Sequence, residues 1–148
     1  MSSVKALESL KKILDKAIKR GGFDRHFEKT KLVSAGNGKF VVEMVVEKEH
    51  TNAFSTLHGG FTASAVDLFS SLAVLTHPKI TENIDLDNTG LSVDIHVKYL
   101  ASAKIGDEII INADTVKLGR NLAFLEVTMT RKADNVIIAK GGQTKFVG

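Results

Sequence analysis

Residues 50–77 read HTNAFSTLHGGFTASAVDLFSSLAVLTH, and this stretch decides the fold. From Phe61 to Thr76 the side chains are small or apolar on every side, and Asp67 is the only charged residue among them. A helix that is apolar all round is normally buried. No proline interrupts the run, and the only proline of the chain, Pro78, stands where the helix should end. The pattern therefore predicts a long buried helix at the centre of the molecule.

Two features of this stretch indicate a reactive site. His58, Gly59 and Gly60 precede the helix, and free N–H groups at a helix amino end can bind an anion or a polarised carbonyl oxygen. The carboxylate of Asp67 is costly inside a buried helix unless it meets water, a partner or a substrate. Asp67 is thus the strongest catalytic candidate, as a base that activates water or as a nucleophile. The sequence leaves both roles open.

The composition limits the class of protein. A chain of 148 residues with 43% hydrophobic and 25% charged residues is typical of one soluble globular domain covering residues 1–148. Its net charge of +3 suits a phosphate-bearing small molecule and is too weak to indicate nucleic acid. The absence of cysteine excludes disulfides, thiolate zinc sites and a cysteine nucleophile.

The chain start and the hydropathy bear on location. The first residues, MSSVKALESLKK, lack the apolar core of a secretory signal, and the apolar run of the central helix is too short and interrupted to span a membrane. We therefore expect a cytoplasmic protein, with mitochondrial import left open by the basic amphipathic start.

The segments around the central helix predict an α+β fold. Apolar residues at helical spacing predict a helix over residues 3–19, ended by Gly21 and Gly22. Strands are expected at 30–35, 39–47, 91–101, 107–118, 121–132 and 135–147, and a loop at 81–90. Short links between the last four strands predict antiparallel neighbours, and alternation from Ser92 to Tyr99 predicts one solvent-facing side for that strand. The antiparallel sheet should wrap around the central helix.

Three segments together resemble a known family: HTNAFSTLHGGFTASAVD from His50, SVDIHVKYLASAKIGD from Ser92 and VKLGRNLAFLEV from Val116. They resemble the hotdog-fold acyl-CoA thioesterases of the phenylacetic-acid-degradation type. The resemblance implies the hotdog fold and hydrolysis of medium- to long-chain fatty acyl-CoA to fatty acid and CoA, with no metal and no cofactor. Ser55 stands where a glycine is common, and Ala101-Ser102 replace a proline-containing turn, which bears on the shape of the substrate pocket.

The resemblance also assigns roles at the catalytic centre. The Gly59 N–H and the Asn52 amide would bind the thioester oxygen as it becomes an oxyanion, and Ser92 would hold the water beside Asp67. On the residues alone, Asn52 is a turn residue. His58 is grouped with the catalytic candidates as a residue that would orient the loop or Asn52, although a lone histidine is more often structural. Phe54, Phe61 and Phe69 are candidates for the acyl channel, although aromatic residues on a buried helix are more often core.

For the CoA moiety, the resemblance points to two segments and one residue near the end of the chain. Lys104, Lys117 and Arg120 would bind the phosphates as charged donors. The full set is Tyr99, Leu100, Ala101, Ser102, Ala103, Lys104, Lys117, Leu118, Gly119, Arg120, Asn121, Leu122 and Phe146.

The spacing of Gly59 and Asp67 predicts a homodimer. Eight positions separate them, which is roughly 12 Å along a helix, whereas a base and an oxyanion donor must both lie about 3 Å from one reacting centre. One helix cannot supply both groups to one site, but two antiparallel copies can. We expect active sites shared between two chains, and the resemblance adds the pairing of dimers into a homotetramer.

Four alternatives compete with this interpretation. A hotdog hydratase or dehydratase would usually need a histidine close to Asp67, and a non-catalytic acyl-CoA-binding protein would keep the fold without turnover. A Ser-His-Asp hydrolase is disfavoured because the chain has no G-x-S-x-G motif. A metal site from His50, His58 and Asp67 lacks a recognisable ligand spacing.

Overall fold

The computed structural model describes residues 1–81 and 84–148 of the chain. Its helices and strands are α1 (Ser3–Lys19), β1 (Lys31–Gly36), β2 (Lys39–Val45), α2 (Gly59–Val74), β3 (Leu91–Tyr99), β4 (Glu108–Leu118), β5 (Leu122–Arg131) and β6 (Val136–Phe146). Short 3-10 helices cover Phe23–Phe27, Lys48–His50 and Leu86–Thr89. Each predicted strand lies within two residues of an observed one. The predicted loop at 81–90 contains the last 3-10 helix, and its residues 82 and 83 lie outside the described residues.

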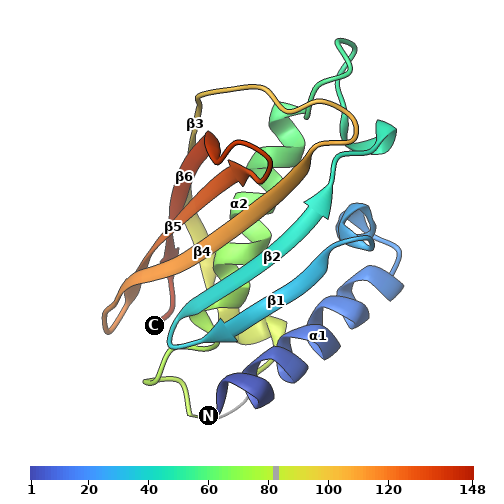
Figure 1. Ribbon diagram of the computed structural model, residues 1–148. Coiled ribbons are helices and arrows are strands. Elements are labelled where there is room, and N and C mark those ends of the chain that lie inside the picture. The colour runs from blue at the N-terminus through green and yellow to red at the C-terminus, as the bar shows by residue number, and fades with distance from the viewer. Residues whose placement is uncertain (82–83) are drawn as a thin grey trace.

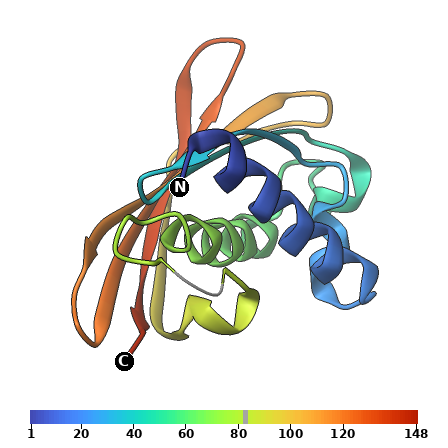
Figure 2. The same ribbon diagram turned by 90° about the horizontal axis from the view of Figure 1, so that it is seen from below.

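The sheet curves around α2, as the sequence predicted (Figure 1). Every pairing is antiparallel, and the strand order is β1-β2-β4-β5-β6-β3. Figure 2 shows α2 inside the curve of the sheet, with α1 running past its open side. This α+β arrangement is the hotdog fold.

Burial of α2 explains its sequence. Phe61, Ala65, Phe69 and Leu72 are at most 7% exposed, and the ring of Phe27 lies against Phe61 and Phe69, at centroid distances of 4.9 and 5.3 Å. Apolar side chains on several sides of the helix therefore meet the sheet on one side and the 3-10 helix that follows α1 on the other. No helix in the described part of the chain is long and apolar enough to cross a membrane.

The strand order corrects one prediction. β3 and β4 were expected to be neighbours, but β3 pairs with β6 at the edge of the sheet, and β4 lies between β2 and β5. The link over residues 100–107 can reach about 26 Å when extended, which exceeds the roughly 14 Å across three strand spacings. Hydrogen bonding of the Leu100 N–H to the Ile138 carbonyl, at 2.9 Å, guides this crossing. A short link therefore did not require neighbouring strands.

A β-bulge in β3 turns Ser92 toward the central helix. Ser92 pairs with Lys145, but Asp94 pairs with the adjacent Thr144, so Val93 is an extra residue in the ladder. A bulge of this kind shifts the alternation of side chains by one position. Strict alternation would place Ser92 on the face of Asp94, whereas in the structure it shares the helix-facing side with Lys145.

Candidate active site

The amino end of α2 is built by His58, Gly59 and Gly60. His58 is the N-cap, and its Nδ1 accepts a hydrogen bond from the Gly60 N–H at 2.8 Å. The Gly59 N–H belongs to the first turn, whose amides have no partner within the helix. Tyr99 donates from Oη to the Gly59 carbonyl at 2.7 Å, and a Cβ on Gly59 would lie only 3.3 Å from the Tyr99 ring. Glycine therefore permits the close approach of β3 to this helix end.

Asn52 closes the loop before α2. Its Oδ1 accepts from the backbone N–H groups of Phe54 and Thr56 at 2.9 and 3.2 Å, and its Nδ2 donates to Thr56 Oγ1 at 2.9 Å. These contacts form a turn around Asn52 and use one of the two hydrogens of its Nδ2. Ser55 in this loop has φ of +59°, a left-handed conformation that favours glycine, and this accounts for the glycine expected there.

The three aromatic residues that are candidates for the acyl channel differ in exposure. Phe54 is 86% exposed at the loop tip, whereas Phe61 and Phe69 are core residues. Within one protomer, therefore, Phe54 is the exposed member of the three, while Phe61 lines a surface pocket beside His58.

Asp67 and Ser92 meet on one side of α2. Asp67 is exposed although its neighbours Ala65, Val66 and Phe69 are buried. The Ser92 Oγ lies 3.3 Å from the Asp67 Oδ1. The structure thus brings together two residues that are 25 positions apart in sequence, and it leaves the carboxylate accessible.

Two polar residues of β6 at this site were missed in the sequence. Gln143 and Lys145 are only 2% and 4% exposed. Gln143 Oε1 lies 2.8 Å from Ser92 Oγ, and Lys145 donates to Ser71 Oγ at 2.6 Å. Burial lowers the pKa of the Lys145 ammonium, and the nearby Asp67 carboxylate partly opposes that shift. The sequence did contain a signal for these two residues. Gln143 and Lys145 are two positions apart, which puts both polar side chains on one face of a predicted strand.

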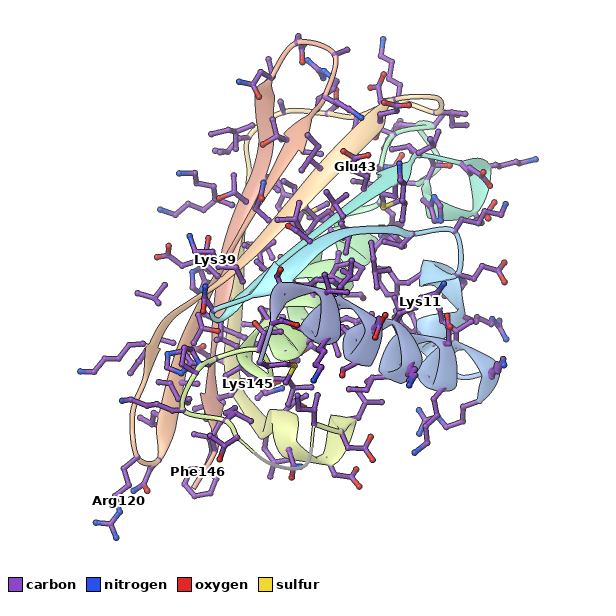
Figure 3. The ribbon with its side chains drawn as sticks, turned by 60° about the horizontal axis from the view of Figure 1, so that its bottom comes forward. Lys11, Lys39, Glu43, Arg120, Lys145 and Phe146 are labelled. Carbon is purple, nitrogen blue, oxygen red and sulfur yellow. The ribbon has the colours of Figure 1, made fainter. Side chains whose placement is uncertain are left out.

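The predicted CoA residues form two groups at opposite ends of the sheet (Figure 1). Tyr99–Lys104 lie beside the amino end of α2, where Tyr99 reaches Gly59 and Lys104 forms a β-bridge with Thr56. The hairpin 117–122 joins β4 and β5 at the other end, where Leu122 pairs with Phe146. Figure 3 shows Arg120 extending outward from the hairpin tip, with Phe146 at the same end. Within the first group Ala103 is buried and the others are exposed.

The histidines considered for a metal site have other partners. His50 Nδ1 accepts from the Glu47 N–H at 3.1 Å, and His58 caps α2. Among residues 1–81 and 84–148, no group of three or more His, Asp or Glu side chains is arranged to hold a metal ion.

Comparison with known proteins defines the class. Residues 54–138 match the thioesterase superfamily. Acyl-coenzyme A thioesterase 13 of Homo sapiens is 43% identical over 141 residues, which cover 95% of this chain and 96% of that protein. The crystal structure of zebra fish thioesterase superfamily member 2 has a TM-score of 0.88 at 42% identity and covers 96% of this chain and 98% of its own. A Streptococcus mutans protein, solved bound to acetyl CoA, has a TM-score of 0.69 at 27% identity, covering 82% of this chain and 90% of its own.

The chain belongs to the thioesterase superfamily. The family resemblance, the hotdog fold and the prediction of a thioester hydrolase are therefore confirmed. The roles of single residues and the preferred acyl chain stay predictions.

Proposed function

We propose that the protein hydrolyses medium- to long-chain fatty acyl-CoA to fatty acid and CoA, at active sites that each combine two chains. Similarity to acyl-coenzyme A thioesterase 13 supports the substrate class, and the acetyl CoA bound by the S. mutans relative supports a CoA thioester in this fold. The site geometry supports the sharing of residues between chains.

The observation that carries the proposal is the separation of the oxyanion donors from Asp67 along α2 of one protomer. The oxyanion donors Gly59 and Asn52 lie with Tyr99–Lys104 at the amino end of α2. Asp67 lies further along the same unbroken helix, beside Ser92 at the start of β3, and the register of β3 with β6 brings this strand start next to Phe146. A twofold axis that reverses α2 would bring one end of each protomer against the other end of its partner.

The edge strand supplies a surface for such a dimer. β3 has a sheet neighbour on one side only, and its apolar residues Leu91, Val93 and Ile95 are 74%, 62% and 43% exposed. A long exposed apolar edge is normally covered by another strand or chain. A second copy pairing along β3 would cover this edge and set two α2 helices side by side. Pairing of such dimers into a homotetramer is part of the proposal, on the family resemblance.

The proposed hydrolysis uses groups from both chains that form an active site. Asp67 of one chain takes a proton from water, whose oxygen attacks the thioester carbonyl carbon. The Gly59 N–H and the Asn52 amide of the other chain stabilise the oxyanion, together with the positive end of the α2 dipole. Collapse of this intermediate breaks the C–S bond, and the CoA thiolate receives the proton. The Ser92 hydroxyl beside Asp67 favours this water route over an Asp67 anhydride, because it offers the water a second hydrogen-bond partner.

Release of free thiol from a panel of acyl-CoA substrates tests the proposal, with an Asp67→Asn variant. We expect kcat to fall at least about 100-fold, the usual scale for loss of a general base, while acyl-CoA binding persists. Asp94→Asn is the matched control, because Asp94 lies on the other face of β3 and binds the Thr144 N–H. Near-normal turnover by Asp67→Asn would refute the assignment. Binding without thiol release by the unchanged protein would favour an acyl-CoA-binding protein, and addition of water to enoyl-CoA would favour a hydratase.

A further inference from the structure

The orientation of the buried Gln143 amide is fixed by its neighbours. Its Nε2 lies 2.9 Å from the Asp67 backbone carbonyl oxygen, which can only accept a hydrogen bond, so the nitrogen must face it. The Oε1 atom therefore faces Ser92 Oγ, at 2.8 Å. An amide oxygen also can only accept, so Ser92 is the donor of this bond.

The hydrogen bond from Ser92 to Gln143 determines whether the Ser92 hydroxyl acts as a donor or an acceptor beside Asp67. A serine hydroxyl has one hydrogen, and two acceptors compete for it: Gln143 Oε1 at 2.8 Å and Asp67 Oδ1 at 3.3 Å. Once the hydrogen points at Gln143, the Ser92 lone pairs remain as acceptors beside the carboxylate. A water can then donate one hydrogen to Asp67 and the other to Ser92, which leaves its own lone pair for the carbonyl carbon. A hydroxyl that donated to Asp67 would compete with the water for its base.

We propose that Gln143 is a positioning residue for thioester hydrolysis, which makes the Ser92 hydroxyl a hydrogen-bond acceptor for the attacking water. This inference rests on the hydrolysis proposed above.

A buried polar network holds Gln143 in this orientation. Its Nε2 lies 2.6 Å from Ser70 Oγ and 3.2 Å from Ser71 Oγ, and Lys145 donates to that same Ser71 oxygen at 2.6 Å. Ser70, Ser71 and Lys145 are at most 6% exposed. Buried polar groups that lose a partner are strongly disfavoured, so a flipped amide, which would turn an oxygen toward the Asp67 carbonyl, is destabilised. The network therefore runs from Lys145 through Ser71 and Gln143 to the Ser92 hydroxyl, which lies 3.3 Å from the Asp67 carboxylate.

A double-mutant cycle with Gln143→Met and Ser92→Ala tests the inference. Methionine has a similar length but can neither accept from Ser92 nor donate to the network. We expect Gln143→Met to lower kcat by about 10-fold or more, with KM nearly unchanged, because a misoriented water affects only the transition state. In the Ser92→Ala background the same change should cost less than about 2-fold, because the hydroxyl that it positions is absent. A merely structural role would give the same loss in both backgrounds.

Controls separate the possible failures. Thr144→Val alters the neighbouring residue, on the other face of β6, and should leave kcat unchanged. If Gln143→Met does not fold, Ser70→Ala removes the 2.6 Å anchor of the amide and should lower kcat several-fold only when Ser92 is present. Full kcat in the folded variants, or equal losses with and without Ser92, would overturn the role of Gln143 while thiol release by the unchanged enzyme persists. Absence of thiol release by the unchanged protein would overturn the proposed function and this inference together.

Discussion

At the residue scale, the least expected feature is a lysine in the core. Lys145 is almost fully buried and donates to the neutral Ser71 oxygen. Burying an ammonium costs free energy that a single hydroxyl recovers only in part. The carboxylate of Asp67 is close enough to oppose the resulting fall in the pKa of Lys145. We interpret Lys145 as a destabilising residue beside Asp67, the proposed catalytic carboxylate.

This interpretation predicts a pH dependence of stability. Because the pKa of Lys145 in the folded state lies below its ordinary value of 10.5, the unfolded chain binds more protons between these two values. The stability of the wild type should therefore rise with pH across that window, as the cost of the buried charge is relieved. Lys145→Met lacks this group. The free energy of unfolding of the wild type should therefore increase relative to that of the variant as the pH rises from neutral toward 10.5. Urea denaturation at several pH values measures the difference.

The matched control is Lys140→Met, on an exposed position of the same strand. Its pH profile should run parallel to that of the wild type. A parallel profile for Lys145→Met as well would show that burial does not disfavour the charge of Lys145.

At the scale of elements, the β4–β5 hairpin acts in the proposal as a handle for CoA. It projects from the sheet with Lys117 and Arg120 near its tip, at the end of the molecule that holds Phe146 (Figure 3). Contacts to a phosphate remote from the thioester are the same in the ground state and the transition state, so their loss changes binding alone.

We therefore expect Lys117→Ala and Arg120→Ala each to raise KM by about 10-fold, the effect of one charged hydrogen bond, with little change in kcat. Both defects should disappear with an acyl-pantetheine substrate, which lacks the nucleotide phosphates. Lys11→Ala on α1, which Figure 3 shows well away from the hairpin, is a control for the general loss of positive charge. A defect that persists on the truncated substrate would contradict the phosphate contacts.

At the scale of the whole molecule, the proposal requires two chains for each site. Mixing two inactive variants tests this requirement: Asp67→Asn removes the base and Gly59→Pro removes the amide donor. The backbone at this position is compatible with proline, because Gly59 is the first residue of α2 and His58 has the extended conformation that precedes proline. In a heterodimer, one site collects both defects and the other collects neither.

After subunit exchange in equal amounts, activity should return to about one quarter of the wild-type value, since half of the dimers are mixed and each has one intact site. Thiol release measures the recovery. Folding of Gly59→Pro must be verified by its unfolding transition, because its Cβ would lie 3.3 Å from the Tyr99 ring. Mixtures as inactive as both parents would mean that Gly59 and Asp67 serve sites within one chain.

Local patterns determined much of this protein. The apolar stretch after Gly59 defined the buried helix, because a helix without a polar face can lie only in a core. Strand patterns and turn residues predicted the remaining elements within two residues for each strand. The charge of Asp67 alone marked it as the catalytic candidate, since an ionised group in such a helix must meet water or a partner.

Only the tertiary structure decided which residues surround Asp67. The bulge at Val93 reverses the side on which Ser92 lies, and no local pattern indicates one extra residue in a ladder that depends on the partner strand. Likewise, the pairing of β3 with β6, rather than β4, sets Ser92 beside Gln143 and Lys145. A sequence shows that these residues are polar, but their burial depends on which strands meet across α2, and that is set by long-range packing.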